Sequence, residues 1–224
     1  MNNNNIIELT NVTKTYTRGS ENIHALDDIN LSVERGEFLS ITGASGSGKT
    51  TLMNIIGCID NPTKGSVKIG SDDVSDMKQS ELTKVRRDTL GFVFQQFYLI
   101  PTLTASENVQ VPGLFANNAQ REKKAEELLK LVGLGDRIDH LPSQMSGGEM
   151  QRTAIARSLI NSPEILLADE PTGNLDSKNA QIIFDTFKKL NKDGLTIIVV
   201  THSKELAQTA NKIVSIKDGK ISTN

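Results

Sequence analysis

The sequence predicts an α/β fold with a mostly parallel sheet. The C-terminal part alternates between helical and strand-like segments, placed at residues 176–192, 195–201, 204–210 and 212–216. Such alternation is typical of crossover units that join parallel strands. In the run 164–169, four consecutive apolar residues end in a carboxylate, as expected of a buried central strand. Another strand-like run, 38–41, leads directly into a glycine-rich loop and a predicted helix over 49–57.

The N-terminal part is predicted to consist mainly of strands. Strands near 6–16, 23–33 and 37–42 precede the glycine-rich loop, and residues 65–70 suit a further strand at a sheet edge. The asparagines at 2–5 form a biased segment that suits a frayed terminus.

The middle of the chain, from residue 97 to about 161, has a helical pattern. Apolar residues recur there at the spacing of one helix face, at Ala125, Leu128, Leu129 and Val132. We interpret this part as a helical insertion within a single domain that spans residues 1–224, since 224 residues suffice for one large α/β core.

The composition argues against several classes of function. With 25 basic and 27 acidic residues, the chain lacks the positive field that dominates nucleic-acid affinity. No apolar run approaches the roughly 18 residues of a membrane-spanning helix, and the N-terminus lacks the features of a signal peptide. A membrane role would therefore need a partner. The single cysteine, Cys58, excludes an internal disulfide, and its apolar neighbours predict a buried, inert thiol suited to the cytosol.

The glycine-rich loop has the spacing of a phosphate-binding loop: a glycine, four residues, then Gly-Lys-Thr. Its glycines let backbone N–H groups turn toward phosphate oxygens at the start of a helix. The residues expected to bind nucleotide here are Gly43, Ala44, Ser45, Gly46, Ser47, Gly48, Lys49, Thr50 and Thr51. Lys49 would reach the β and γ phosphates, and the Thr50 hydroxyl would bind Mg²⁺. The alternative, a flexible Gly/Ser turn, is disfavoured by the flanking strand and helix.

Two acidic residues, Asp169 and Glu170, follow the predicted central strand. Ligands of open α/β sheets bind at the carboxyl edge of such strands. Asp169 would hold Mg²⁺ through its water shell, and Glu170 would take a proton from the attacking water as general base. An acid pair after a strand is often only a helix start, but the phosphate loop upstream favours the functional interpretation. Together these segments predict a nucleotide hydrolase.

Further segments in a fixed order complete a family resemblance. They are Gln95 after the strand-like run 91–94, the segment Ser146, Gly147, Gly148 and Glu149, the segment Asn174, Leu175 and Asp176, and His202 after the strand-like run 196–201. With the phosphate loop and the acid pair, they resemble the ATP-binding cassette (ABC) ATPases over essentially the whole chain. The runs 52–57, 91–96 and 172–176 resemble the branch of macrolide exporters, lipoprotein-releasing ATPases and antimicrobial-peptide transporters.

The resemblance implies a P-loop NTPase core with a mostly parallel sheet and an inserted helical subdomain. It also implies an antiparallel β-subdomain, to which we assign the strands near 6–16, 23–33, 37–42 and 65–70. ATP and Mg²⁺ are the expected substrate and cofactor.

The segment from Ser146 to Glu149 has two interpretations. Ser146 and Glu149 form a capping box that opens a helix running to about residue 161. Gly147 and Gly148 leave the first N–H groups of that helix exposed, and such a positive helix end binds anions. The resemblance implies that this site closes on ATP held by a second copy, giving a homodimer around two ATP molecules. A capping box with incidental glycines is the alternative.

The resemblance also implies roles for three further polar residues. His202 would contact the γ-phosphate and hold water in line with Glu170, although a histidine after a strand is often only structural. Gln95 would contact Mg²⁺ or the attacking water at the joint with the helical insertion, although a glutamine at a strand end is usually unremarkable. Asp176 would serve the subunit interface.

Aromatic residues give two further expectations, each with an alternative. Tyr16 ends the first predicted strand, where the family places a ring that stacks on adenine, but a strand-edge tyrosine is possible. The apolar segment 97–101 suits either the core or a groove that receives a helix from a membrane partner. His24 and His140 are expected to be ordinary surface or packing residues.

Three functions are consistent with these motifs. In the leading one, the chain is the motor of a transporter, held at the cytoplasmic face of the inner membrane by an integral membrane permease. That permease would export peptides, lipoproteins or hydrophobic drugs. The second function keeps the ATPase but drives mechanical signalling or cell-wall control through a non-transporting membrane protein. The third is a soluble switch ATPase, although such relatives usually join two cassettes or insert long coiled coils.

Overall fold

The computed structural model describes residues 4–19 and 21–222, and two sheets organise them. The six-stranded sheet has the order β10 (Lys220–Ser222), β9 (Lys212–Lys217), β3 (Phe38–Thr42), β8 (Thr196–Val200), β7 (Ile165–Asp169) and β6 (Leu90–Val93). All its neighbouring strands run parallel except β9 and β10. The predicted α/β fold with a mostly parallel sheet is confirmed. Of the asparagines at 2–5, the first two lie outside the described residues, and Asn5 begins a strand rather than a frayed end.

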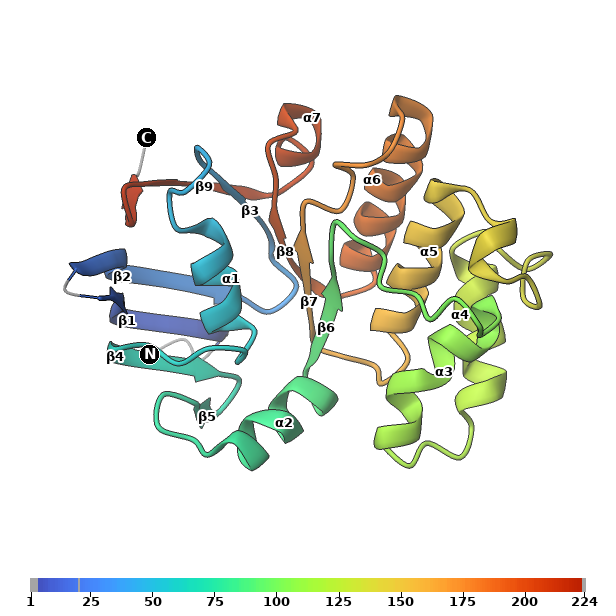
Figure 1. The fold of residues 1–224 in the computed structure, drawn as a ribbon, viewed down its shortest axis with the longest axis horizontal. Helices are drawn as coiled ribbons and strands as arrows, with labels where there is room; N and C mark the ends of the chain where they lie inside the picture. The colour runs from blue at the N-terminus through green and yellow to red at the C-terminus, as the bar shows by residue number, and fades with distance from the viewer. Residues whose placement is uncertain (1–3, 20, 223–224) are drawn as a thin grey trace.

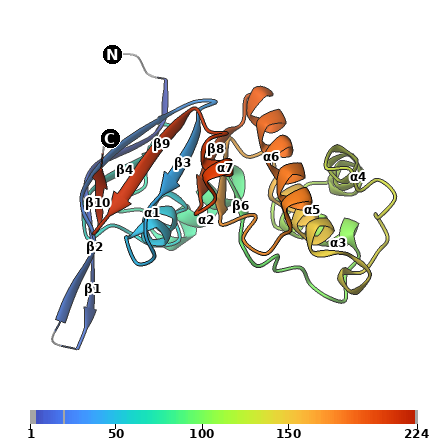
Figure 2. The ribbon, with the colours of Figure 1, turned by 90° about the horizontal axis from the view of Figure 1, so that it is seen from above.

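The second sheet is antiparallel and has the order β2 (Glu21–Glu34), β1 (Asn5–Arg18), β4 (Lys64–Ile69) and β5 (Asp72–Asp73). It lies at one end of the molecule, and a long ribbon of β1 and β2 projects from it (Figure 2). The assignment of residues 37–42 to this sheet was wrong. Residues 38–41 of β3 are all buried and pair with β8 and β9, because a strand apolar on both faces is stable only inside a covered sheet.

Seven α-helices complete the described part of the chain. They are α1 (Lys49–Ile56), α2 (Gln79–Asp88), α3 (Ala105–Phe115), α4 (Arg121–Leu131), α5 (Gly147–Ser158), α6 (Ser177–Lys192) and α7 (Lys204–Ala207), with a 3-10 turn η1 (Pro142–Gln144) before α5. Helices α3, α4 and α5 gather at the end of the molecule opposite the antiparallel sheet (Figures 1 and 2). The sequence pattern had not indicated α2, in which only Leu82 and Val85 are buried.

The core has two parts, one on each face of the parallel sheet. Helix α1 fills the space between the two sheets, where Leu52, Ile55 and Ile56 are almost fully buried. On the other face, α5 and α6 pack against the sheet, and Phe187 packs edge-on against Phe38 with ring centroids 6.5 Å apart. Cys58 is buried as predicted, and burial raises the pKa of its thiol to about 11. The carboxyl ends of β3, β7 and β8 therefore rest on a rigid, closely packed base.

Candidate functional site

The phosphate loop lies between β3 and α1, as the sequence predicted. Gly43, Gly46 and Gly48 have positive φ values of 149°, 76° and 109°. The Lys49 side chain is only 7% exposed, and its ammonium donates to the carbonyl oxygens of Gly43 at 2.9 Å and Ala44 at 2.8 Å. An ammonium has three donors, so one remains for an anion in the loop. The loop and its lysine are thus held ready for phosphate.

A cleft of about 350 Å³ opens beside this loop and brings distant sequence motifs together. The predicted residues that line it are Ser45, Gly46, Gly48, Lys49, Thr50, Thr51, Gln95, Asp169, Glu170 and His202. The predicted residues that do not line it are Tyr16, Gly43, Ala44, Ser47, Ser146, Gly147, Gly148 and Asp176. The helix end at Ser146 therefore lies outside the cleft of its own chain.

The strand β2 contributes three cleft residues that the sequence had not indicated, Ile23, His24 and Ala25. His24, expected to be an ordinary surface or packing residue, places Nδ1 3.1 Å from the Thr15 hydroxyl on β1. The pairing of Tyr16 with Ile23 and of Thr15 with His24 explains this position. The pairing of the first two predicted strands could have indicated these residues. Residues that pair with Tyr16 and its neighbours lie close to any ligand that Tyr16 contacts.

Glu170 and His202 meet at the carboxyl edge of the parallel sheet. Glu170 has φ of 46°, and its N–H donates to the Val200 carbonyl at 2.9 Å. The His202 backbone N–H donates to Glu170 Oε2 at 3.2 Å, and His202 Nε2 lies 3.3 Å from Oε1. The backbone bond thus holds Oε2, while Oε1 stands beside the His202 ring without a hydrogen-bond partner among the described residues.

Asp169 has the electrostatic character of a cation ligand. Burial and the adjacent Glu170 carboxylate raise the pKa of Asp169, while Lys49 and His202 oppose the shift. Thr50, Gln95 and Asp169 present a hydroxyl, an amide and a carboxylate to one cleft, and such hard oxygen donors fit Mg²⁺. The described residues contain no group of three or more His, Cys, Asp or Glu side chains placed to hold a metal. The donor set therefore suits an ion that shares its coordination with nucleotide oxygens.

Gln95 is held at the cleft by Asn174. Its Nε2 donates to Asn174 Oδ1 at 3.3 Å, and Asn174 Nδ2 donates to the Gln95 carbonyl at 3.1 Å. These two bonds join the segment after β6 to the segment after β7. Gln95 therefore lies in the segment that leads from β6 to α3, and its contact with Mg²⁺ or the attacking water stays a prediction.

Ser146 caps α5 through the predicted capping box. Its backbone N–H donates to Glu149 Oε2 at 2.8 Å, and the Glu149 N–H donates to Ser146 Oγ at 3.3 Å. Arg137 Nε donates to the other carboxylate oxygen of Glu149 at 3.1 Å. The first N–H groups of α5 are thus presented by a fixed helix end, with no phosphate-binding loop of the same chain beside it.

The model of the family described as "ABC transporter" matches residues 26–173. The chain belongs to the ABC transporter family. The ABC transporter ATP-binding protein MJ0796 of Methanocaldococcus jannaschii is 52% identical over 223 residues, which cover 96% of this chain and 95% of that protein. MacB of Burkholderia thailandensis, a macrolide export ATP-binding/permease protein, is 46% identical over 218 residues. That match covers 96% of this chain and 33% of MacB.

A solved structure of MJ0796 supports the same conclusion. It is described as the dimeric structure of a post-hydrolysis state bound to ADP and Pi. It superimposes on this ABC cassette with a TM-score of 0.90, at 50% identity and with 97% of each chain covered. The chain is an ABC ATPase with the fold of that family. Within the described residues, no helix of this ABC ATPase has the length and apolarity needed to span a bilayer.

Tyr16 of this ABC ATPase does not line the cleft of its own chain. Its hydroxyl donates to Asp60 Oδ2 at 2.8 Å, and the Lys14 amino group lies 5.0 Å from the ring centroid. Burial and the Asp60 bond raise the pKa of the Tyr16 hydroxyl. The side chain is still 40% exposed, so its stacking on adenine stays a prediction.

The C-terminal hairpin of the ABC ATPase supports the phosphate loop from outside. The Gly219 N–H donates to the Ser47 carbonyl at 3.0 Å. A Cβ atom on Gly43 would lie 2.3 Å from the Ile216 carbonyl oxygen, so only glycine fits this approach. The loop is therefore clasped between its own helix and strands that come much later in the sequence.

Gly148 lies against the first turn of α6, the helix that begins after Asp176. A Cβ atom on Gly148 would lie 2.1 Å from Asn179 Oδ1 and 2.9 Å from Asn179 Cβ. Asp176 caps α6, accepting from the Asn179 N–H at 2.9 Å and from Asn179 Nδ2 at 2.7 Å. Asp176 therefore holds Asn179 against the first turn of α5.

We expect Gly148→Ala to destabilise the ABC ATPase by about 1–3 kcal/mol, because the added methyl must displace the Asn179 side chain and strain its bonds to Asp176. Gly147→Ala is the matched control, since the nearest atoms to its Cβ position are 3.7 Å away. Denaturant unfolding of both variants measures the difference. Equal stability of the two variants would contradict the close contact between α5 and α6.

We expect Glu149→Ala to cost about 1 kcal/mol near neutral pH, the usual worth of a helix cap. The bonds from Ser146 and Arg137 lower the pKa of Glu149. A lowered pKa means that the ionised side chain stabilises the fold above its unfolded pKa, and that this contribution is lost as pH falls through the folded value. The free energies of unfolding of the wild type and Glu149→Ala, measured from pH 7 to below about pH 4, should become equal in acid. A difference independent of pH would contradict this role.

Proposed function

We propose that this ABC ATPase works as a homodimer, in which each chain sandwiches ATP between its own phosphate loop and the signature segment 146–149 of the other. The observation that supports this most directly is the position of the Ser146 helix end, which does not line the cleft of its own chain. An exposed helix N-terminus binds anions, so it suits the γ-phosphate of ATP held by a second copy. The dimeric MJ0796 structure lends support.

We propose the following roles within each composite site. Lys49 binds the phosphates, and Glu170 takes a proton from the attacking water while His202 keeps Glu170 and the γ-phosphate in line. Thr50, Gln95 and Asp169 hold Mg²⁺, which when bound neutralises charge on the phosphate oxygens. Tyr16 stacks on adenine, and Asp176 serves the dimer interface. Loss of the bridging γ-phosphate opens the dimer, and this movement is the output of the cycle.

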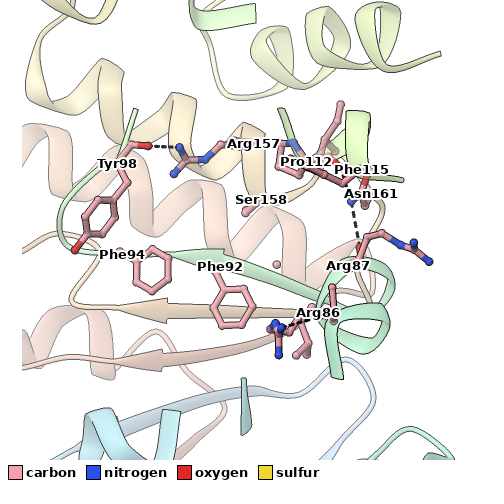
Figure 3. A pocket seen from close by; sticks show the side chains of 14 residues that line it. Arg86, Arg87, Phe92, Phe94, Tyr98, Pro112, Phe115, Arg157, Ser158 and Asn161 are labelled. Carbon is pink, nitrogen blue, oxygen red and sulfur yellow. Dashed lines mark hydrogen bonds between the residues drawn. The ribbon is translucent and has the colours of Figure 1, made fainter. Parts of the chain in front are cut away.

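The movement could be passed to a partner bound in an apolar groove of about 520 Å³ (Figure 3). Phe92 and Phe94 stack with ring centroids 5.9 Å apart, and Tyr98 packs edge-on against Phe94 at 5.5 Å. Tyr98 and Phe115 are 63% and 74% exposed, too much for core residues. Of the two interpretations of residues 97–101, the groove is therefore favoured, at least at Tyr98.

We propose that a helix of an integral membrane permease occupies this groove. Phe94 and Tyr98 line it and flank Gln95, so a helix seated there would follow any movement of the segment that carries Gln95. MacB is named as an ATP-binding/permease protein, and the match covers a third of its length, which supports a role for this ATPase together with a permease. The partner would hold the ATPase at the cytoplasmic face of the inner membrane. The cargo would be peptides, lipoproteins or hydrophobic drugs, with residues 97–161 serving as a helical subdomain inserted in one ABC domain.

The test is to express tagged Glu170→Gln chain in its own cells, solubilise the membranes with Mg-ATP and identify stoichiometric partners. A multi-span membrane protein with a cargo-binding part would support export. A membrane partner without one would favour signalling, and soluble partners alone would contradict the proposal.

A groove variant sharpens this test. Phe115→Glu places a charge on the exposed rim of the groove and should abolish copurification without loss of ATPase activity. Ile213→Glu is the matched control, because Ile213 is also exposed, at 53%, but lies on β9 outside the groove. Retention of the partner by Phe115→Glu would argue against the groove as the docking site.

A further inference from the structure

Gln151 lies one turn inside α5 and has no exposed surface. Its Nε2 donates to the Phe94 carbonyl at 3.2 Å and to the Pro171 carbonyl at 2.7 Å. Neither acceptor belongs to α5. Phe94 follows β6 and Pro171 follows β7, and these strands are neighbours in the parallel sheet. One buried amide therefore joins a helix to the ends of two strands.

The two acceptors stand next to residues of the nucleotide cleft. Phe94 directly precedes Gln95, and Pro171 directly follows Glu170. The Phe94 carbonyl belongs to the peptide group that joins Gln95 to the chain, and the Pro171 carbonyl lies one residue beyond the peptide group that follows Glu170. Because both carbonyl groups are bonded to α5, they limit how far the Gln95 and Glu170 side chains can move relative to that helix.

Arg157, further along α5, binds the same segment a second time. Its guanidinium donates to the Phe97 carbonyl at 2.7 Å and the Tyr98 carbonyl at 2.5 Å. The segment 94–98 is therefore bonded to α5 at both ends. Gln95 lies between these bonds, so it is attached to α5 as well as to the parallel sheet.

The chemistry of the contact requires a glutamine amide. Two carbonyl oxygens face the side chain, and only its nitrogen carries two hydrogens to satisfy both. The Gln151 Oε1 atom has no hydrogen-bond partner among the described residues, so the nitrogen makes both contacts. A glutamate would set a negative oxygen against the two carbonyls, and a methionine would fill the space but leave both buried acceptors unpaired.

We propose that Gln151 is a positioning residue for ATP hydrolysis, which locks Gln95 and Glu170 to the helix whose N-terminus receives the ATP of the second copy. The inference rests on the proposed ATP sandwich. When that ATP draws the N-terminus of α5 toward it, Gln151 transmits the movement to the groups that orient and deprotonate water in the cleft of its own chain. Each chain thereby aligns its own site only when it has engaged its partner's ATP.

The test compares Gln151→Met with Thr153→Val in the full-length chain. Thr153 is the matched control, because it is equally buried on α5 but its hydroxyl donates only to the Glu149 carbonyl of the same helix, at 3.0 Å. Mg-ATPase kinetics and melting temperature are measured for both. If Gln151→Met does not fold, Gln151→Asn, whose amide is one methylene too short to reach, takes its place.

We expect Gln151→Met to lower kcat by at least about tenfold, since a displacement near 1 Å costs on the order of 10²-fold. The KM for ATP should change by less than about threefold, because the phosphate loop is untouched. Thr153→Val should keep kcat within about twofold of the wild type, even where the two melting temperatures fall equally. Equal kcat values for the two variants, or a raised KM with unchanged kcat, would overturn the proposal.

A double-mutant cycle with Gln95→Ala tests the route of the effect. If Gln151 acts in part through Gln95, the two losses in kcat combine to less than their product. Losses that multiply fully would exclude this route. The proposed function is tested separately, by wild-type ATP turnover and by copurification of the membrane partner. If no membrane partner copurifies, the kcat values of these variants relative to the wild type still test the role of Gln151.

Discussion

Replacing Glu170 with glutamine should reduce ATP turnover by about 10²-fold or more while leaving nucleotide binding intact. The glutamine amide keeps the size of the side chain but cannot take a proton from water. The His202 N–H donates to the side chain and the Glu170 N–H donates to the Val200 carbonyl, and both bonds can form in the variant, so the loss is chemical rather than structural. Because ATP then persists at the interface, the variant should also accumulate as an ATP-bound dimer.

Steady-state ATPase kinetics and light scattering with saturating Mg-ATP measure both effects. Glu164→Gln is a matched control, since Glu164 stands just before the opposite end of β7 and pairs with Arg35 far from the cleft. It should hydrolyse ATP like the wild type. A Glu170→Gln chain that stays monomeric with saturating Mg-ATP would show that the ATP-sandwich scheme is wrong.

Lys49→Ala should weaken ATP binding by at least about 10²-fold, which corresponds to roughly 3 kcal/mol. The Lys49 ammonium is buried and already desolvated, so its attraction for phosphate is stronger than that of a surface lysine. The same change removes the two bonds that tie the loop carbonyls of Gly43 and Ala44. Loop order and charge are therefore lost together.

Titration calorimetry with ATP measures this loss, and thermal unfolding without nucleotide separates loop order from charge. Lys188→Ala, on the exposed face of α6, controls for a general loss of positive charge and should bind ATP normally. Binding by Lys49→Ala within about tenfold of the wild type would exclude a central role for this lysine.

The sequence was most informative where local chemistry determines local structure. The phosphate loop requires glycines at fixed places, and the capping box at Ser146 requires particular side chains at a fixed spacing, so both were predicted with their residues. The alternation of helices and strands in the C-terminal part followed from hydrophobic periodicity. The position of β3 did not, because a five-residue apolar strand carries no mark of which sheet it will join.

Contacts between distant segments explain what the sequence could not reveal. Gln151 looks like an ordinary helix residue until the fold brings two carbonyl groups to it. The contact of Gly148 with Asn179 depends in the same way on how α5 packs against α6. His24 reaches the cleft only through strand pairing. Helix α2 escaped notice because it buries too few apolar side chains to show a clear period.

The clasp that Ile216 and Gly219 place on the phosphate loop has a consequence for how the protein is made. Residues 43–50 leave the ribosome early, but the β9 strand that pairs with β3, and the Gly219 N–H that binds Ser47, are synthesised much later. At about 5–20 residues per second, this leaves the loop without its support for many seconds. A nascent or prematurely terminated chain therefore lacks a finished phosphate loop until β9 and the hairpin that follows it have been made.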